Sequence, residues 1–218
     1  MKSVELITFD LGGTLLSPFP TVGEAYAEEL EDLGYICDPT RLQSRFDSAI
    51  QDWMQYHGQG NSRDDRESWL SIVRTTIAEE NIPEDSFARV FEQLYEAFAH
   101  ASRWSIHDGT RDALETLTAR GVRLAVASNN DTRARQVLKE HQLIDFFEAL
   151  FLSGEIGFEK PDERFFAHIS EVTRVPPENI LHIGDSPRHD FDGARNAGMQ
   201  AYIVSTFGHS LNDFIEQF

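Results

Sequence analysis

Residues of the kind that carry out chemistry follow three apolar runs of the sequence. Asp10 ends the run LITF, Ser128 and Asn129 end the run VRLAVA, and Asp185 follows ILHIG. An unpaired carboxylate costs several kcal/mol to bury, so an acid at the mouth of a buried strand is solvated, caps a turn, or takes part in chemistry. Ligands of doubly wound parallel sheets bind at the carboxyl ends of the strands. We therefore expect these side chains to meet at one edge of a sheet.

The acids at this edge predict a divalent cation. Two carboxylates that come close repel each other, and Mg²⁺ binds to one or two carboxylates together with waters and phosphate oxygens. Asp10 and Asp185 suit that role, and Asp190 in the segment GDSPRHD could hold a metal-bound water or a neighbouring ligand. We expect a Mg²⁺ site that is built on these three acids.

The other polar residues at this edge predict a phosphate site beside the cation. Ser128 and Asn129 lie where the amides of a helix N-terminus would point, and Lys160 supplies a compact positive charge. Phosphoryl transfer depends mostly on positioning and on neutralising charge, so this set of residues is nearly complete for it. The nucleophile would be Asp10, because a carboxylate can form an aspartyl-phosphate. Glu159, next to the lysine, is expected at the surface.

The second half of the chain alternates between strand-like and helix-like patterns. Continuous hydrophobic runs that are separated by helices predict a parallel sheet covered on both faces, which is an α/β fold. Asp131 is expected to cap the second of these helices, and Pro161 is expected at the first position of the third. The patterns predict strands over 122–129, 148–156, 179–185 and 200–205, and helices over 109–121, 131–143, 161–172 and 187–198.

Residues 17–101 differ from the rest, because they contain few β-rich runs and several stretches of helical periodicity. We expect a compact insertion of four helices, over 22–35, 41–57, 67–82 and 86–100. The insertion leaves the α/β domain after its first strand and returns before the second. The predicted domains are therefore an α/β core of residues 1–16 and 102–218 and a helical domain of residues 17–101.

Some side chains of the insertion have a role that the pattern does not decide. Trp53, Tyr56 and Trp69 either line a substrate pocket or belong to the core of the helices, where aromatic residues at helical spacing are common. Arg63 and Arg66 either meet an anionic substrate or belong to a solvated loop.

The composition excludes some classes of partner and indicates a compartment. The sequence has 37 acidic and 19 basic residues, a formal net charge of -18, which argues against nucleic acid and against an anionic membrane surface. The single cysteine, Cys37, cannot form an internal disulfide, which is typical of the reducing cytosol. The N-terminus has the pattern of a first strand, and no stretch approaches the roughly 20 apolar residues of a membrane span. We expect a cytoplasmic protein.

Four segments, taken in order, resemble the motifs of the haloacid dehalogenase-like hydrolase superfamily: DLGGTL, SNN, GFEKPDERFF and IGDSPRHDFDGARNAGM. The resemblance implies that Asp10 is the nucleophile, that Ser128 binds phosphate, that Lys160 takes part in catalysis, and that Asp185 and Asp190 lie at the metal. It also implies a Rossmann-like core. The helical insertion resembles the first cap type (C1) of that family, a domain that closes over the site, excludes water and selects the substrate.

The sequence departs from this pattern at Gly12. Phosphatases of the family usually carry a second Asp there, which protonates the leaving oxygen and later activates the water. Gly12 keeps the backbone carbonyl that binds the metal in the family, but it lacks the acid/base side chain, whose effect is typically about 10²–10⁴ in rate. His57, His107 and His189 are candidates to replace it.

Three functions therefore remain open. The expected one is Mg²⁺-dependent hydrolysis of a small phosphomonoester, a phosphorylated metabolite, through an aspartyl-phosphate on Asp10. The second is a metal-independent 2-haloacid dehalogenase, because members of that branch of the family also lack the second Asp. The third is a non-catalytic or weakly active binding or regulatory protein that keeps the fold.

Overall fold

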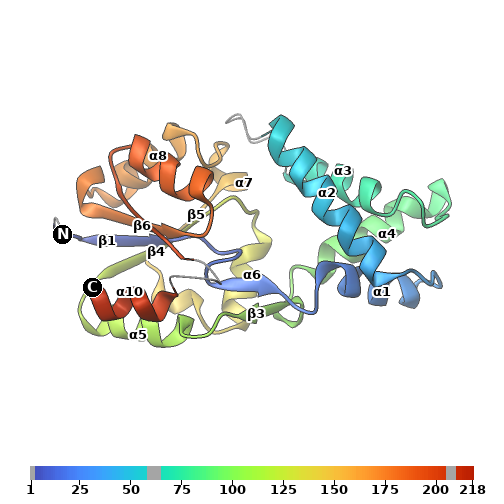
Figure 1. The fold of residues 1–218 in the computed structure, drawn as a ribbon, viewed down its shortest axis with the longest axis horizontal. Coiled ribbons are helices and arrows are strands. Elements are labelled where there is room, and N and C mark those ends of the chain that lie inside the picture. Colours follow the sequence, from blue (N-terminus) through green and yellow to red (C-terminus); the bar gives the residue numbers. More distant parts are fainter. Residues whose placement is uncertain (1–2, 58–64, 205–209) are drawn as a thin grey trace.

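The computed structural model describes residues 3–57, 65–204 and 210–218, and it consists of an α/β part and a helical part that lie side by side along the long axis (Figure 1). The α/β part is built on a sheet of five parallel strands in the order β5-β4-β1-β6-β7. The strands are β1 (Leu6–Phe9), β4 (Arg123–Ser128), β5 (Ala149–Leu152), β6 (Ile180–Gly184) and β7 (Gln200–Ile203). The predicted parallel, Rossmann-like sheet is therefore confirmed.

Helices cover both faces of the sheet, because the side chains of each strand alternate between two apolar cores. Ile7 and Phe9 of β1 pack in one core with the helices of residues 110–119, 133–140 and 211–217, whereas Leu6 packs in the other with the helices of residues 163–173 and 193–196. Burial on both faces explains the continuous hydrophobic runs of the sequence. The helices of this part are α5 (Thr110–Ala119), α6 (Arg133–Glu140), α7 (Ser153–Ile156), α8 (Glu163–Thr173), α9 (Gly193–Asn196) and α10 (Leu211–Gln217), with shorter helical segments at η1 (Ala101–Arg103), η2 (Ile144–Phe146), η3 (Pro177–Asn179) and η4 (Pro187–Asp192).

The helical part has a core of its own. Its buried side chains recur at helical spacing, as Phe87, Val90, Phe91 and Leu94 do in α4, and they pack against one another across the helices. Its helices are α1 (Val22–Asp32), α2 (Pro39–His57), α3 (Asp65–Thr76) and α4 (Glu84–Ala97).

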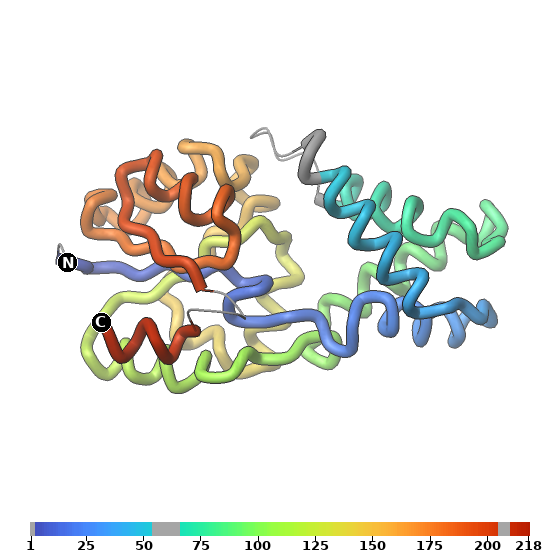
Figure 2. Tube along the Cα trace, viewed as in Figure 1, coloured from blue at the N-terminus to red at the C-terminus, as the bar shows by residue number. Residues whose placement is uncertain are grey.

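Two short strands that the sequence analysis did not predict link the helical part to the α/β part. β2 (Leu16–Pro18) and β3 (Trp104–Ile106) pair antiparallel where the chain leaves the α/β part and where it returns. Figure 2 shows the two passages of the chain side by side at this point. Each strand has only three residues, which is too short for a pattern of alternation to be visible in the sequence.

The structure corrects several predicted elements at the edge of the sheet where the strands end. The strand predicted over 148–156 ends at Leu152, and its second half forms α7, because the chain turns out of the sheet there and closes the turn on Gly157 in the left-handed conformation. Pro161 lies before α8 instead of within it, because Asp162 caps that helix by accepting the Arg164 amide.

Of two further predictions in this region, the helix is present in a different form and the helix cap is wrong. The helix predicted over 187–198 consists of the π-helical segment η4 followed by the short helix α9. The cap residue of α6 is Thr132, and Asp131 instead accepts hydrogen bonds from the amide and the guanidinium of Arg133. In addition, α10 was not predicted.

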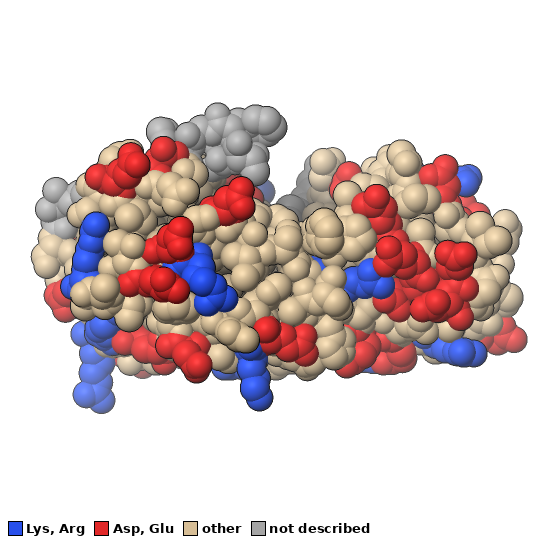
Figure 3. All heavy atoms as spheres, turned by 90° about the horizontal axis from the view of Figure 1, so that it is seen from below, with Lys and Arg blue, Asp and Glu red and all other residues tan. Residues whose placement is uncertain are grey.

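The surface carries the excess of acid that the sequence predicts. On the face drawn in Figure 3, acidic side chains are spread over both parts of the molecule, with basic side chains between them. Among the described residues, no helix is both long enough and apolar enough to cross a membrane.

A substitution at Gly193, the first residue of α9, would measure how tightly η4 and α9 pack against α8. A Cβ at this position would lie 2.7 Å from Cε2 of Phe166 and 3.0 Å from the backbone of Pro161. Alanine would gain about 0.5–1 kcal/mol from helix propensity, but overpacking a core costs about 1–3 kcal/mol. We expect Gly193→Ala to lower the free energy of unfolding by about 1 kcal/mol or more, as measured by urea denaturation.

The double variant with Phe166→Leu provides the control for this prediction. The leucine removes the ring that the new methyl group meets, so the cost of the alanine should be smaller in that background. A single variant as stable as the parent protein would contradict the close packing described here.

Candidate active site

The candidate residues converge at the carboxyl edge of the sheet. Asp10 follows β1, Ser128 ends β4, and Asp185 follows β6, and these three strands are neighbours in the sheet. Lys160 reaches the same place from the loop before α8, and Asp190 reaches it from η4. The five side chains line one cavity of about 380 Å³, which we call the acidic cleft.

A buried ion pair holds the centre of this cleft. The Nζ atom of Lys160 lies 2.7 Å from Oδ1 of Asp10 and 2.6 Å from Oδ1 of Asp190, and all three side chains are buried. Burial by itself would lower the pKa of Lys160, but the negative charges of Asp10 and Asp190 outweigh burial and raise that pKa above its ordinary value. The lysine is therefore a fixed positive charge between two carboxylates.

Asp190 is in turn held by groups that the sequence analysis did not identify. His182, a fully buried residue of β6, bonds to Oδ1 of Asp190 at 3.0 Å through Nε2 and to the hydroxyl of Thr8 at 2.9 Å through Nδ1. The amide of Ser186 donates to Oδ2 of Asp190 at 2.8 Å. Burial would raise the pKa of Asp190, but Lys160 and His182 hold it far below its ordinary value. The only signal in the sequence is a single histidine within the apolar run ILHIG.

The two polar residues at the end of β4, Ser128 and Asn129, have different contacts. The hydroxyl of Ser128 donates to Oδ1 of Asp10 at 2.8 Å. The side-chain amide of Asn129 bonds to the backbone of Lys160 in both directions, donating to its carbonyl at 2.9 Å and accepting from its N–H at 2.7 Å. Asn129 therefore fixes the loop that carries Lys160, although it also lines the cleft.

Three carboxylates in the cleft form a group that could hold a metal ion. One oxygen each of Asp10, Asp185 and Asp190 lie within 4.8 Å of one another. Asp185 is exposed to solvent at the mouth of the cleft, and its partial desolvation there, followed by the charges of Asp10 and Asp190, raises its pKa to about 6. A set of oxygen donors with excess negative charge is the kind that Mg²⁺ prefers.

The glycines after Asp10 shape the approach to this group. Gly12 lines the cleft, and a Cβ placed on it would have no atom within 4 Å. Gly13 adopts φ +79°, and a Cβ there would lie 2.4 Å from Oδ2 of Asp185. The turn therefore packs against the Asp185 carboxylate and leaves open space beside Gly12.

The three histidines named as substitutes for the missing acid differ in position. His189 lines the cleft, and burial lowers its pKa below the ordinary value. His107 follows β3 and bonds to the hydroxyl of Ser17 at 2.5 Å, within the β2–β3 ribbon. The side chain of His57 lies outside the described part of the structure.

The helical part forms the opposite wall of the cleft. Trp53 of α2 and Trp69 of α3 both line it, together with Ile50, Ser68 and Ile72. Arg66 pairs with Glu92 and lies over the rings of Phe91 and Tyr95. The side chains of Tyr56 and Arg63 lie outside the described residues.

The expectation for Glu159 is wrong. The structure buries this residue, with 3% of its surface exposed, and it lines the cleft beside Lys160. The reason is that the loop of residues 157–162 turns inward to bring the lysine to Asp10, so that the neighbouring side chain is enclosed with it.

Lys160 offers a test of the ion pair. We expect Lys160→Met in metal-free protein to lower the free energy of unfolding at pH 7 by about 3–5 kcal/mol, because it leaves two buried carboxylates without their cation. The loss should shrink in acid, since the carboxylates of the variant can then be neutralised by protons. Urea denaturation at a series of pH values measures both effects.

Lys139→Met is the matched control for that experiment. Lys139 is exposed on α6, so this variant should change stability by no more than about 0.5 kcal/mol. If the two methionine variants were equally stable, the buried pair would not be the constraint described here.

Comparisons with known proteins identify the family of this chain. A family model described as haloacid dehalogenase-like hydrolase matches residues 4–198. "Haloacid dehalogenase-like hydrolase domain-containing protein 3" of Homo sapiens is 32% identical over 207 residues, which cover 92% of this chain and 82% of that protein. The same protein of Xenopus laevis is 31% identical over 206 residues, which cover 93% and 84%.

Solved structures share the fold. The putative HAD-hydrolase YfnB from Bacillus subtilis, a structure bound to magnesium, covers 99% of both chains with a TM-score of 0.82 and 21% identity. Other matching structures are described as a predicted phosphoglycolate phosphatase and as dehalogenases, also below 25% identity, so these likenesses show the fold alone. The family model and the relatives confirm the resemblance that the four motifs predict, and this chain belongs to the haloacid dehalogenase-like hydrolases.

Proposed function

We propose that this hydrolase is a Mg²⁺-dependent phosphatase that acts on a small phosphomonoester through an aspartyl-phosphate on Asp10. The observation that supports it is the charge of the cleft: four carboxylates line it, three of them within 4.8 Å of one another, and one buried ammonium group lies beside them. Like charges at this distance are unfavourable, and after desolvation the charges of Asp10 and Asp190 contribute to the raised pKa of Asp185. A divalent cation relieves that repulsion, and a bound phosphate gives it further oxygen ligands.

The cation would be held by Asp10, Asp185, the Gly12 carbonyl and, directly or through water, Asp190. When bound, it neutralises charge on the carboxylates and on the phosphoryl oxygens. Ser128 and Lys160 would hold the transferring phosphoryl group, and Asn129 would keep Lys160 in place through its two backbone hydrogen bonds.

The hydrogen bonds of Asp10 indicate which of its oxygens attacks. Ser128 and Lys160 both donate to Oδ1, so these donors orient the carboxylate and leave Oδ2 for phosphorus. Oδ2 forms the new O–P bond while the bond to the leaving oxygen breaks with its electron pair. Water then cleaves the aspartyl-phosphate, releasing inorganic phosphate and restoring Asp10. Because Gly12 supplies no acid, the leaving oxygen takes its proton from water.

The charge of the cleft also favours this function over the alternatives. Metal-independent dehalogenation would leave the negative charge of Asp185, beside those of Asp10 and Asp190, without a cation to balance it. A purely structural role does not require the nucleophile to be oriented by a buried lysine and a serine at hydrogen-bonding distance. Structural neighbours of both enzymatic kinds exist, so the fold alone does not choose between them.

The first test combines metal removal with loss of the nucleophile. We expect hydrolysis of p-nitrophenyl phosphate that requires Mg²⁺, stops on chelation, and falls by at least about 10³-fold in Asp10→Asn. Asp192→Asn, which changes an exposed acid of η4, is the matched control and should keep the activity. Halide release from a 2-haloacid without metal, or full activity of the Asp10 variant, would contradict the proposal.

The second test restores the missing acid. The backbone of Gly12 is outside the left-handed region, and the space beside it is open, so an aspartate fits there. If the chemistry is slowed by the lack of an acid, Gly12→Asp should raise kcat by about 10²-fold or more. Gly12→Asn has nearly the same shape and no proton to give, so it should show no such gain. Equal rates for the two variants would mean that the acid is not what limits turnover.

A further inference from the structure

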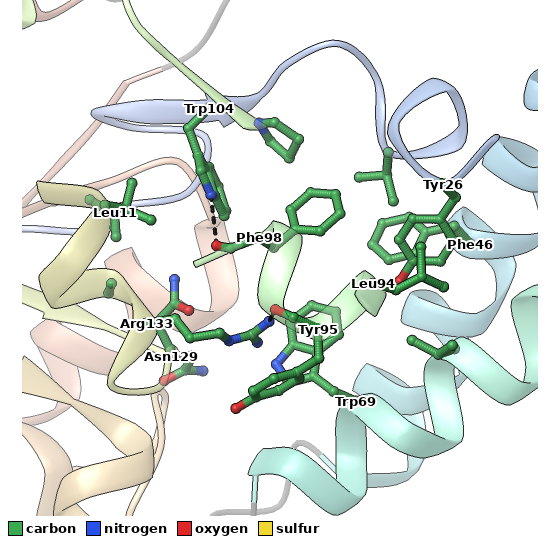
Figure 4. A pocket seen from close by; sticks show the side chains of 16 residues that line it. Leu11, Tyr26, Phe46, Trp69, Leu94, Tyr95, Phe98, Trp104, Asn129 and Arg133 are labelled. Carbon is green, nitrogen blue, oxygen red and sulfur yellow. Dashed lines mark hydrogen bonds between the residues drawn. The ribbon is translucent and has the colours of Figure 1, made fainter. Parts of the chain in front are cut away.

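A second cavity, which we call the aromatic cavity, lies between α6 of the α/β part and the helical part (Figure 4). Its volume is about 170 Å³. Six aromatic side chains line it: Tyr26, Phe46, Trp69, Tyr95, Phe98 and Trp104. Most of the remaining wall is aliphatic, with Leu11, Val73 and Ala134 among its members. The chemistry set out above for Asp10 makes no use of it.

Three of the polar side chains in its wall, Trp104, Arg133 and Tyr95, make hydrogen bonds within the protein. The indole N–H of Trp104 donates to the carbonyl of Phe98 at 3.1 Å. The guanidinium of Arg133 donates to both oxygens of Asp131 and to the carbonyl of Tyr95, and its Cζ lies 3.7 Å from the centroid of the Tyr95 ring. The hydroxyl of Tyr95 donates to Asp131 at 3.1 Å.

The cavity is therefore electrically neutral. Arg133 is the one cation among the described residues that line it, and Asp131 neutralises it. Burial raises the pKa of Tyr26 far above its ordinary value, so that hydroxyl also stays uncharged. A carboxylate or a second phosphate would find no unpaired cation in this wall.

The aromatic cavity and the acidic cleft are neighbours. Trp69, Asn129 and Asn130 line both of them. The loop after β1 also takes part in both, because Asp10 and Gly12 line the cleft whereas Leu11 between them lines the aromatic cavity. The two cavities therefore share part of their walls, and a substrate that occupied both would pass Trp69.

The volume fits one ring. A cavity of about 150 Å³ lined by aliphatic and aromatic side chains holds a benzene molecule. The aromatic cavity is of that size and more aromatic in its lining. Removing apolar surface from water favours binding by about 25 cal/mol for each Å². For one apolar ring, this raises the affinity by about tenfold or more.

We propose that the aromatic cavity binds the leaving group of the substrate, and that this group is uncharged, apolar and of the size of one ring. This inference rests on the proposed phosphatase function, since it names the class of phosphomonoester that the cleft takes. The proposed substrates are phosphate esters of aromatic or cyclic alcohols, and esters that carry a second charge are poor substrates.

Catalysis tests the selectivity. Ethyl phosphate, 2-phenylethyl phosphate and phosphoglycolate are all alkyl esters, so differences in leaving-group chemistry are small among them. We expect kcat/KM for 2-phenylethyl phosphate to exceed that for each of the other two by about tenfold or more. Ala134→Met fills the cavity from α6 and should reduce that ratio severalfold. Ala119→Met, an exposed change at the end of α5, is the matched control and should leave the ratio unchanged.

Binding tests the cavity without any catalysis. Trp69 and Trp104 lie in its wall, so 2-phenylethanol should produce a saturable change in tryptophan fluorescence in metal-free protein. Ala134→Met should weaken that binding severalfold, and Asp10→Asn should leave it intact. The fluorescence titration also measures binding of 2-phenylethanol to Ala134→Met if that variant folds but no longer turns over substrate.

The outcomes separate the two proposals. Selectivity for the phenylethyl ester together with saturable binding of the alcohol supports the inference. Equal kcat/KM for the three esters, or fluorescence that never saturates, overturns it even if the enzyme is a phosphatase. Saturable binding without hydrolysis of any ester overturns the proposed function and leaves a ring-binding site in place.

Discussion

The structure of the candidate site depends on one buried ammonium group that two carboxylates share. Lys160 lies 2.7 Å from Asp10 and 2.6 Å from Asp190, and all three side chains are buried. Charges buried in this way are unfavourable unless each is paired and hydrogen-bonded, and here the hydrogen bonds continue through His182 to Thr8. The ends of β1 and β6, the loop before α8 and η4 must therefore keep fixed relative positions. Any other arrangement of these charges would cost free energy.

Much of this arrangement could be predicted from the sequence, for a physical reason. In a parallel sheet the carboxyl ends of the strands meet at one edge, so Asp10, Ser128 and Asp185 had to be close once the strands were recognised. The histidine behind Asp190 could not be predicted, because one histidine in an apolar strand has the same pattern whether it bonds to a buried acid or to solvent. Glu159 was placed wrongly since burial of that loop follows from the lysine's contacts and not from local polarity.

In the helical part, the spacing of apolar residues predicts the helices but not what each side chain contacts. Its four helices follow from the spacing of apolar residues, but the same spacing does not distinguish a ring in the helical core from one that faces a neighbouring part. Trp69 packs with that core, lines the acidic cleft and lines the aromatic cavity. Asp131 resembles a helix cap in sequence, yet in three dimensions it joins Tyr95 of α4 to Arg133 of α6, a contact between segments 36 residues apart. Such contacts depend on how the helices dock.

The charge of the acidic cleft affects which leaving group the aromatic cavity can accept. In the proposed complex, the three carboxylates around the metal, the neighbouring Glu159 and a phosphate dianion face one ammonium group and one divalent cation, so the cleft already holds more negative than positive charge. A leaving group with its own carboxylate would add to that excess at a site where charges interact strongly because little water is present. A neutral ring adds no charge, and by filling the adjacent cavity it excludes water from the phosphoryl group, which strengthens the contacts of Lys160. The neutral wall around Arg133 and the charged cleft around Lys160 are thus consistent with a single substrate that is anionic at one end and apolar at the other.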